Sequence, residues 1–136
     1  RNKKILRFES AEANKVLIQT PENLFELRKN GPQWSLEKPE KIKIEHMGND
    51  LVWALKGLEF SSKIIPALPT NLSGLDAPKF TLRLFKNNEE EIATLKVGKS
   101  FDSEQEYLVE TGNLQYRVKN KSLDSIPLSL DKFKLK

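Results

Sequence analysis

Apolar and polar residues alternate with a period of two along much of the chain. The alternation is clearest in LFELRK (24–29), QWSLEK (33–38) and FTLRLF (80–85), where Phe25 and Leu27 illustrate the apolar face. A period of two is that of a β-strand with one buried and one solvated face. These ranges are therefore predicted to be strands of an antiparallel sheet with one dry face.

Three further segments are strand-like but less regular. KVLIQ (15–19) has three apolar residues in a row, as in a strand buried on both faces, and LEFSSKII (58–65) alternates. EIATLKVG (91–98) departs from strict alternation, which predicts a bulge near Ala93 and Thr94.

Short turn sequences separate these segments. Asn30-Gly31-Pro32 follows the strand at 24–29, and Asn87-Asn88 follows the strand at 80–85. Thr111-Gly112-Asn113 lies between EQEYLVE (104–110) and LQYRVK (114–119), which is a strong hairpin pattern. Turns this short join antiparallel neighbours, so the strands are predicted to form meanders.

One helix is predicted near the middle of the chain. IKIEHM (42–47) is strand-like, and Gly48-Asn49-Asp50 is interpreted as a break after it. The helix is expected over 51–56, with Asp50 as its N-cap and Gly57 as its C-terminal stop.

Proline and glycine shape the connections that remain. Pro66 and Pro69 limit the next segment to a loop or a single turn, and Gly74 supplies backbone freedom there. Leu75 is expected to reach into the core. Pro127 divides the C-terminal segment into two short turns.

These elements predict an α+β fold, mainly antiparallel β-sheet with one or two short helices. A chain of 136 residues with 38% hydrophobic content suits one domain spanning 1–136. Two loosely similar halves, about 15–65 and 79–136, each place strands before a helical segment. No cysteine is present, which excludes disulfides, thiolate zinc sites and a cysteine nucleophile.

The sequence contains no recognisable catalytic or nucleotide-binding motif. His46 is the single histidine and is expected at the surface, and no Gly-x-Ser-x-Gly or phosphate-binding loop occurs. Glu89-Glu90-Glu91 is interpreted as a solvated turn. Asp102 and Glu104 are interpreted as loop residues, with cation binding as the alternative. No catalytic, cofactor or metal site is therefore predicted.

The sequence predicts a buried environment for one tryptophan and an exposed environment for the other. Trp34 shares a strand face with Leu36 and is expected in the core. Trp53 lies off the apolar stripe of Leu51, Leu55 and Leu58, which predicts an exposed side chain. An exposed tryptophan marks a partner surface, with the membrane–water interface and simple boundary packing as alternatives.

Basic residues gather at both ends of a chain whose net charge is +4. If the termini lie close together, these residues form one basic patch, with solvated tails as the alternative. No motif for nucleic-acid binding accompanies them. The residues expected to contact an anionic surface are Arg1, Lys3, Lys4, Arg7, Lys132, Lys134 and Lys136.

The order of several short motifs resembles the bacterial domain of unknown function 4340 family. The motifs are LFELRKNGPQWSLEKP (24–39), GLDAP (74–78), TLKVGK (94–99), EYLVETGNLQYRV (106–118) and SLDSIPLSLDKFKLK (122–136). The chain departs from the family at IKIEHMGND (42–50), where members usually have a small-residue element before the helix.

The resemblance implies an envelope protein without an established enzymatic activity. Such proteins are anchored by an N-terminal membrane segment, and some are encoded near transporter components. We therefore expect a periplasmic or equivalent location, with an anchor upstream of Arg1. The expected function is a non-enzymatic module that binds a protein partner in an envelope assembly or transport complex. A small-ligand or glycan-binding domain is the alternative.

Overall fold

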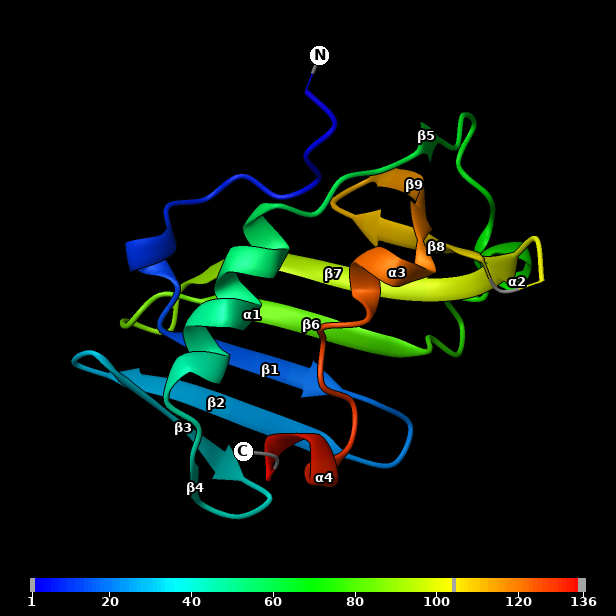
Figure 1. Cartoon of the computed structure of the whole chain (residues 1–136). Coiled ribbons are helices and arrows are strands. Elements are labelled where there is room, and N and C mark those ends of the chain that lie inside the picture. The colour runs from blue at the N-terminus through cyan, green and yellow to red at the C-terminus, as the bar shows by residue number, and fades with distance from the viewer. Residues whose placement is uncertain (1, 104, 135–136) are drawn as a thin grey trace.

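A computed structural model describes residues 2–103 and 105–134, and its main feature is one antiparallel sheet (Figure 1). The sheet order is β4-β3-β2-β1-β6-β7-β8-β9-β5. The strands are β1 (Lys15–Gln19), β2 (Leu24–Asn30), β3 (Gln33–Lys38), β4 (Ile42–Lys43), β5 (Ser62–Lys63), β6 (Phe80–Phe85), β7 (Glu91–Phe101), β8 (Glu106–Thr111) and β9 (Leu114–Lys119). The predicted α+β class with a mainly antiparallel sheet is confirmed.

The helices are short except for one. They are the 3-10 turn η1 (Ser10–Glu12), α1 (His46–Lys56), α2 (Thr70–Ser73), α3 (Asn120–Leu123) and α4 (Leu130–Phe133). Figure 1 shows α1, α3 and α4 on the same face of the sheet. Pro127 lies between α3 and α4, as the C-terminal sequence predicted.

Two meanders meet along the central pair of strands. β1, β2 and β3 form one meander and β6 to β9 form the other, and β1 pairs with β6. The edge strand β5 comes from the first half of the sequence but pairs with β9 of the second. A single sheet therefore includes strands from both halves of the chain.

Alternation along the strands places the core between the sheet and α1. Val16, Ile18, Phe25 and Leu27 are buried, while their sequence neighbours point toward the other face. Leu17 is only half-buried, so the expectation that 15–19 is buried on both faces is wrong.

Helix α1 begins five residues before the predicted start. It opens at His46, and Asp50 is not its N-cap. Gly48 lies inside the helix, where a Cβ would stand 2.1 Å from Cγ of the Trp34 ring. The glycine interpreted as a helix break is therefore the point of closest contact between α1 and the sheet, whereas Gly57 does end the helix.

The buried tryptophan completes this contact. Trp34 is 1% exposed, and its indole Nε1–H donates a hydrogen bond of 3.0 Å to Asn49 Oδ1. The only polar atom of the ring is thus satisfied by the residue next to Gly48, which allows the rest of the ring to lie in an apolar environment.

The predicted bulge in 91–98 is confirmed, because the register along β6 and β7 shifts where Leu84 faces Ala93 and Phe85 faces Glu91, which leaves Ile92 as the extra residue. Two other details differ from the sequence expectations. Within 58–65 only Ser62–Lys63 forms a strand. The predicted core residue Leu75 is only half-buried.

The Gly-Leu-Asp-Ala-Pro stretch packs against an irregular part of β7. Gly74 ends α2 with φ +81°, a conformation that favours glycine. A Cβ there would lie 2.7 Å from the backbone nitrogen of Lys99. A Cβ on Gly98 would in turn lie 2.4 Å from the carbonyl oxygen of Ser73. The two glycines let these backbones approach closely, beside the register shift between β7 and β8.

Replacing Gly48 by alanine is expected to destabilise the protein. Alanine in an exposed helix interior gains about 1 kcal/mol over glycine. Here the added methyl would overlap the Trp34 ring, and overpacking of a core costs about 1–3 kcal/mol. Urea unfolding of Gly48→Ala should therefore show a lower midpoint than the parent chain.

Gly57→Ala is the matched control at the end of the same helix. Its Cβ would meet only ordinary contacts, the nearest being the Trp53 carbonyl oxygen at 3.5 Å. Its unfolding midpoint should change little. Equal stability of Gly48→Ala and the parent would contradict the packing described for α1.

Candidate binding groove

The N-terminal segment is held beside the C-terminal end of α1. The Ile5 N–H donates a 3.1 Å hydrogen bond to the Leu58 carbonyl, and the Phe60 N–H donates one of 3.0 Å to the Lys3 carbonyl. Ile5 and Leu6 are buried, whereas Lys3, Lys4 and Arg7 are exposed. Burial of two consecutive apolar residues thus fixes a segment whose basic side chains project outward.

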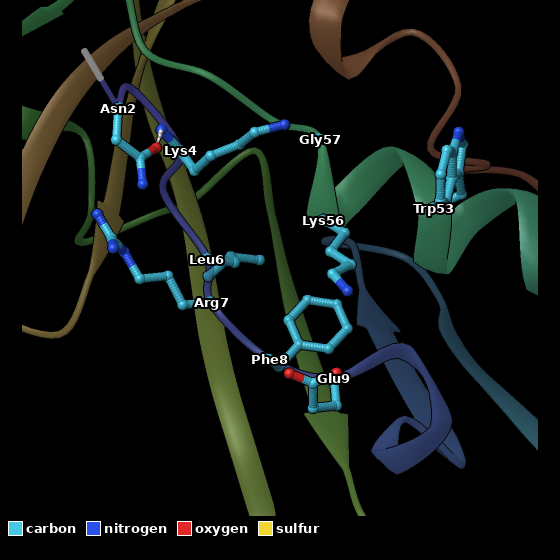
Figure 2. Close-up of a pocket in the computed structure, with 9 residues that line it drawn as sticks. All are labelled: Asn2, Lys4, Leu6, Arg7, Phe8, Glu9, Trp53, Lys56 and Gly57. Carbon is cyan, nitrogen blue, oxygen red and sulfur yellow. Dashed lines mark hydrogen bonds between the residues drawn. The ribbon is translucent and has the colours of Figure 1, made fainter.

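A groove of about 610 Å³ lies between this segment and α1 (Figure 2). Leu6 and Phe8 supply apolar surface, and Lys4, Arg7 and Lys56 supply positive charge. The complete lining is Asn2, Lys4, Leu6, Arg7, Phe8, Glu9, Trp53, Lys56 and Gly57. The groove combines an apolar base with a mainly basic rim, which suits binding of an anionic and partly apolar molecule.

Trp53 is the most distinctive residue of the groove. Its side chain is 76% exposed, whereas Leu51, Val52 and Leu55 on the same helix are buried. Trp53 also lines a second hollow of about 360 Å³ with Ala54, Gly57, Leu58, Glu59 and Ser122. The predicted exposure of Trp53 is confirmed, and its indole borders two adjoining concave surfaces.

Lys4 extends toward the end of α1 in Figure 2. Its Nζ lies 4.0 Å from the position that a Cβ would occupy on Gly57, and the Gly57 N–H donates a 3.0 Å hydrogen bond to the Trp53 carbonyl. A cation is favoured there because the C-terminal end of a helix carries partial negative charge.

The basic residues of the two ends do not form a single patch. Lys4 and Arg7 line the groove, while Lys3 lines an adjoining hollow with Lys119. Lys132 in α4 and Lys134, which follows α4, lie at the opposite end of the molecule from the N-terminal segment (Figure 1). The predicted contacts at Arg1 and Lys136 fall outside the described residues.

The remaining candidate residues lie away from the groove. His46 is exposed at the first position of α1. Asp102 pairs with Arg117 in a turn, and Glu104 falls outside the described residues. Within 2–103 and 105–134, no cluster of three or more histidine, aspartate or glutamate side chains is arranged to hold a metal ion. No helix in the same ranges has the length and apolar character to span a membrane.

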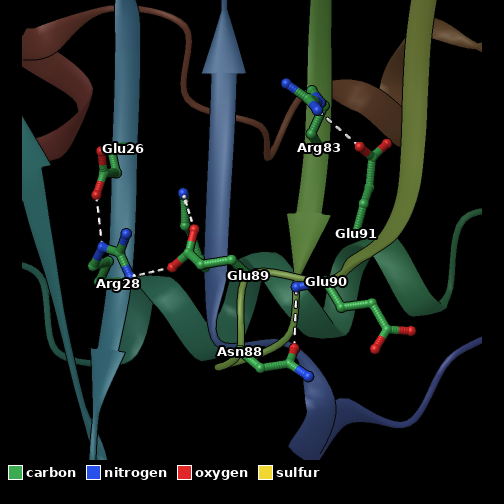
Figure 3. A network of polar contacts seen from close by, with 8 residues as sticks. Glu26, Arg28, Arg83, Asn88, Glu89, Glu90 and Glu91 are labelled. Atoms are coloured by element: carbon green, nitrogen blue, oxygen red, sulfur yellow. Dashed lines mark hydrogen bonds and ion pairs between the residues drawn. The ribbon is translucent and has the colours of Figure 1, made fainter.

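Charges on the sheet face opposite α1 are neutralised by one another (Figure 3). Glu89 accepts hydrogen bonds from Lys15 Nζ at 2.7 Å and from Arg28 Nη1 at 3.0 Å. Lys15 and Arg28 are direct cross-strand neighbours, so Glu89 bridges two like charges. Glu91 pairs with Arg83 at 2.8 Å. The acidic turn is therefore bound to the sheet rather than simply solvated.

Hydrogen bonds hold these carboxylates in their ionised form. The pKa of Glu89 lies below its ordinary value of 4.5, because Lys15 first and then Arg28 donate hydrogen bonds to its carboxylate. The pKa of Glu91 is lowered mainly by the Thr94 hydroxyl and then by Arg83. This network is self-contained and leaves little unpaired charge for a ligand.

No family model matches the chain, and no curated protein or solved structure matches it either.

The sequence patterns predicted that Trp53 is exposed and selected the N-terminal basic residues as candidate contacts, but they did not predict the groove. Phe8, Lys56 and Gly57 become groove residues because the segment before η1 crosses the end of α1. The available signal was the apolar pair Ile5-Leu6 inside a basic stretch, which indicates a segment anchored to the core. Its location beside α1 depends on contacts between distant parts of the chain.

Trp53 is expected to supply the solvent-accessible part of the tryptophan emission. The chain has two tryptophans, and Trp34 is buried. Trp53→Phe should shift the emission maximum to shorter wavelength and remove most of the quenching by iodide. Circular dichroism should confirm an unchanged fold. Iodide quenching that persists in Trp53→Phe would contradict the exposure of this side chain.

Stability is expected to fall at acid pH, and Glu89 contributes to the loss. A carboxylate whose folded-state pKa is lowered stabilises the native state above its unfolded value of 4.5. The contribution disappears as the pH falls through the lower folded-state pKa. Urea unfolding from about pH 7 to about pH 3 should show a shallower pH dependence for Glu89→Gln than for the parent.

Glu22→Gln is the control for this experiment. Glu22 is exposed between β1 and β2 and makes no ion pair among the described residues. It should retain the pH dependence of the parent chain. Identical profiles for Glu89→Gln and Glu22→Gln would show that the bridge to Lys15 and Arg28 does not contribute.

Proposed function

We propose that this chain is a binding module that docks a protein partner through the Trp53 groove. The observation that supports the proposal is the exposed indole of Trp53 at the border of two adjoining hollows. Tryptophan is enriched among residues that dominate binding energy in protein interfaces, because it buries a large rigid surface at little entropic cost. A binding role is favoured over a catalytic one because the lining offers contact surface and positive charge.

The resemblance carried by the motifs at 24–39, 74–78, 94–99, 106–118 and 122–136 adds an expected cellular setting to this proposal. We propose that the domain works outside the cytoplasm, tethered to a membrane by a segment upstream of Arg1. Its partner would then belong to an envelope assembly or transport complex. The groove borders the N-terminal segment, so the proposed tether would place the docking surface close to the membrane.

The alternative is a small-ligand or glycan-binding domain. Its support is the indole of Trp53 beside a concave surface, since aromatic rings stack on sugar rings and other flat apolar faces. Such a ligand would bind the native state and raise its melting temperature in a thermal-shift screen. A neutral glycan would not use the basic side chains of the rim, so the protein-partner proposal is preferred.

Site-specific photo-crosslinking in native membranes tests the proposed docking surface. A photoreactive amino acid at Lys56, beside Trp53 in the groove lining, should capture a discrete partner protein. Trp53→Ala should reduce that product by about tenfold, because it removes the largest contact surface of the site.

Two controls make this result specific. A photoreactive residue at Thr81, on the opposite face of the sheet, should not give the same product. Ile65→Ala removes an equally exposed apolar side chain outside the groove and should leave the product unchanged. An absence of any discrete product, or equal loss with Ile65→Ala, would refute the docking proposal.

A further inference from the structure

Three cations line the groove without an ionic partner among the described residues. Lys4, Arg7 and Lys56 form no salt bridge within 4.0 Å to any described carboxylate, although Glu9 also lines the groove. On the opposite face of the sheet Lys15, Arg28 and Arg83 are all paired. The groove therefore presents uncompensated positive charge beside apolar surface.

The backbone that borders the groove is also without partners. Among the described residues, neither the N–H nor the C=O group of Leu6, Arg7 or Phe8 takes part in a backbone hydrogen bond. These residues belong to no helix or strand. A segment outside any strand, whose backbone donors and acceptors make no bond among the described residues, can pair with an extended chain, as in peptide recognition by strand addition.

We infer that the groove binds an extended, acidic peptide segment of the partner, with an apolar side chain of that segment packed against Trp53. The inference rests on the proposed protein-docking function and specifies the chemistry of the partner. Carboxylates of the segment would face Lys4, Arg7 and Lys56, and its backbone would pair with residues 6–8. The three features coincide in one groove.

An extended peptide fits the groove better than the other anionic surfaces available. A bilayer surface is broad and is contacted by protruding side chains, whereas Leu6 and Phe8 line a hollow. Lipid headgroups would also leave the free backbone groups of residues 6–8 without ordered partners. An acidic peptide offers carboxylates to the three cations, backbone groups to residues 6–8 and an apolar side chain to the Trp53 indole.

A pair of matched peptides tests the inference on the intact chain. One short fluorescein-labelled peptide alternates glutamate and aspartate with leucine and phenylalanine, and the other has glutamine and asparagine in place of the acids. Fluorescence anisotropy should show that the acidic peptide binds about tenfold more tightly at low salt. The difference should shrink as salt is raised, because exposed charges are screened.

Charge reversal locates the binding to the groove. The double variant Lys4→Glu and Arg7→Glu should weaken binding of the acidic peptide by about tenfold or more. The double variant Lys132→Glu and Lys134→Glu changes the net charge equally at the other end of the molecule, and should have little effect. Binding of the acidic peptide should change the tryptophan emission of Trp53→Phe less than that of the parent chain, because the variant lacks the tryptophan of the groove.

Several outcomes would overturn the inference. Equal binding of the two peptides would show that the carboxylates do not contribute to recognition. Equal loss of binding in both double variants would show that only the net charge of the protein matters, and not the position of Lys4 and Arg7. Vesicles containing phosphatidylglycerol that bind through Lys4 and Arg7, while neither peptide binds, would assign the groove to a membrane surface. If the yield of crosslinked partner depends on Trp53 but not on Lys4 and Arg7, the inference of an acidic segment is refuted. The proposal that a protein docks at the groove would still stand.

Discussion

The packing of α1 against the sheet through Gly48 and Trp34 is the contact on which the rest of the molecule depends. A glycine at this point lets the helix approach the indole closely, and Asn49 satisfies the indole N–H. Once this contact is made, helical geometry fixes the direction of every other side chain of α1. Leu51, Val52 and Leu55 are directed inward, and Trp53 is directed toward solvent.

The groove is a consequence of this arrangement at the far end of the helix. α1 ends at Gly57, and the following residues pair with the N-terminal segment through hydrogen bonds at Ile5 and Phe60. The two segments are distant in the sequence yet adjacent in space, and the hollow between them combines side chains of both. A rigid helix and an anchored extended segment thus form opposite sides of one surface.

The distribution of charge separates a structural surface from a candidate binding surface. Opposite α1, acidic residues of the β6–β7 turn bridge lysine and arginine side chains of neighbouring strands, so the charges there stabilise the sheet. Around the groove the cations have no such partners among the described residues. Charge that the fold does not use internally remains for an external molecule, and the exposed indole supplies the apolar part of the same surface.

The sequence by itself determined most of the strands, the hairpin turns, the burial of Trp34 and the exposure of Trp53, because these follow from local periodicity and turn residues. It misplaced the start of α1, because local propensity disfavours Gly48 in a helix whereas packing against Trp34 requires it. It also left open where the basic ends lie. Only the tertiary structure separated the two ends and placed Lys4 and Arg7 beside Trp53, since those neighbours are set by long-range contacts that no local pattern encodes.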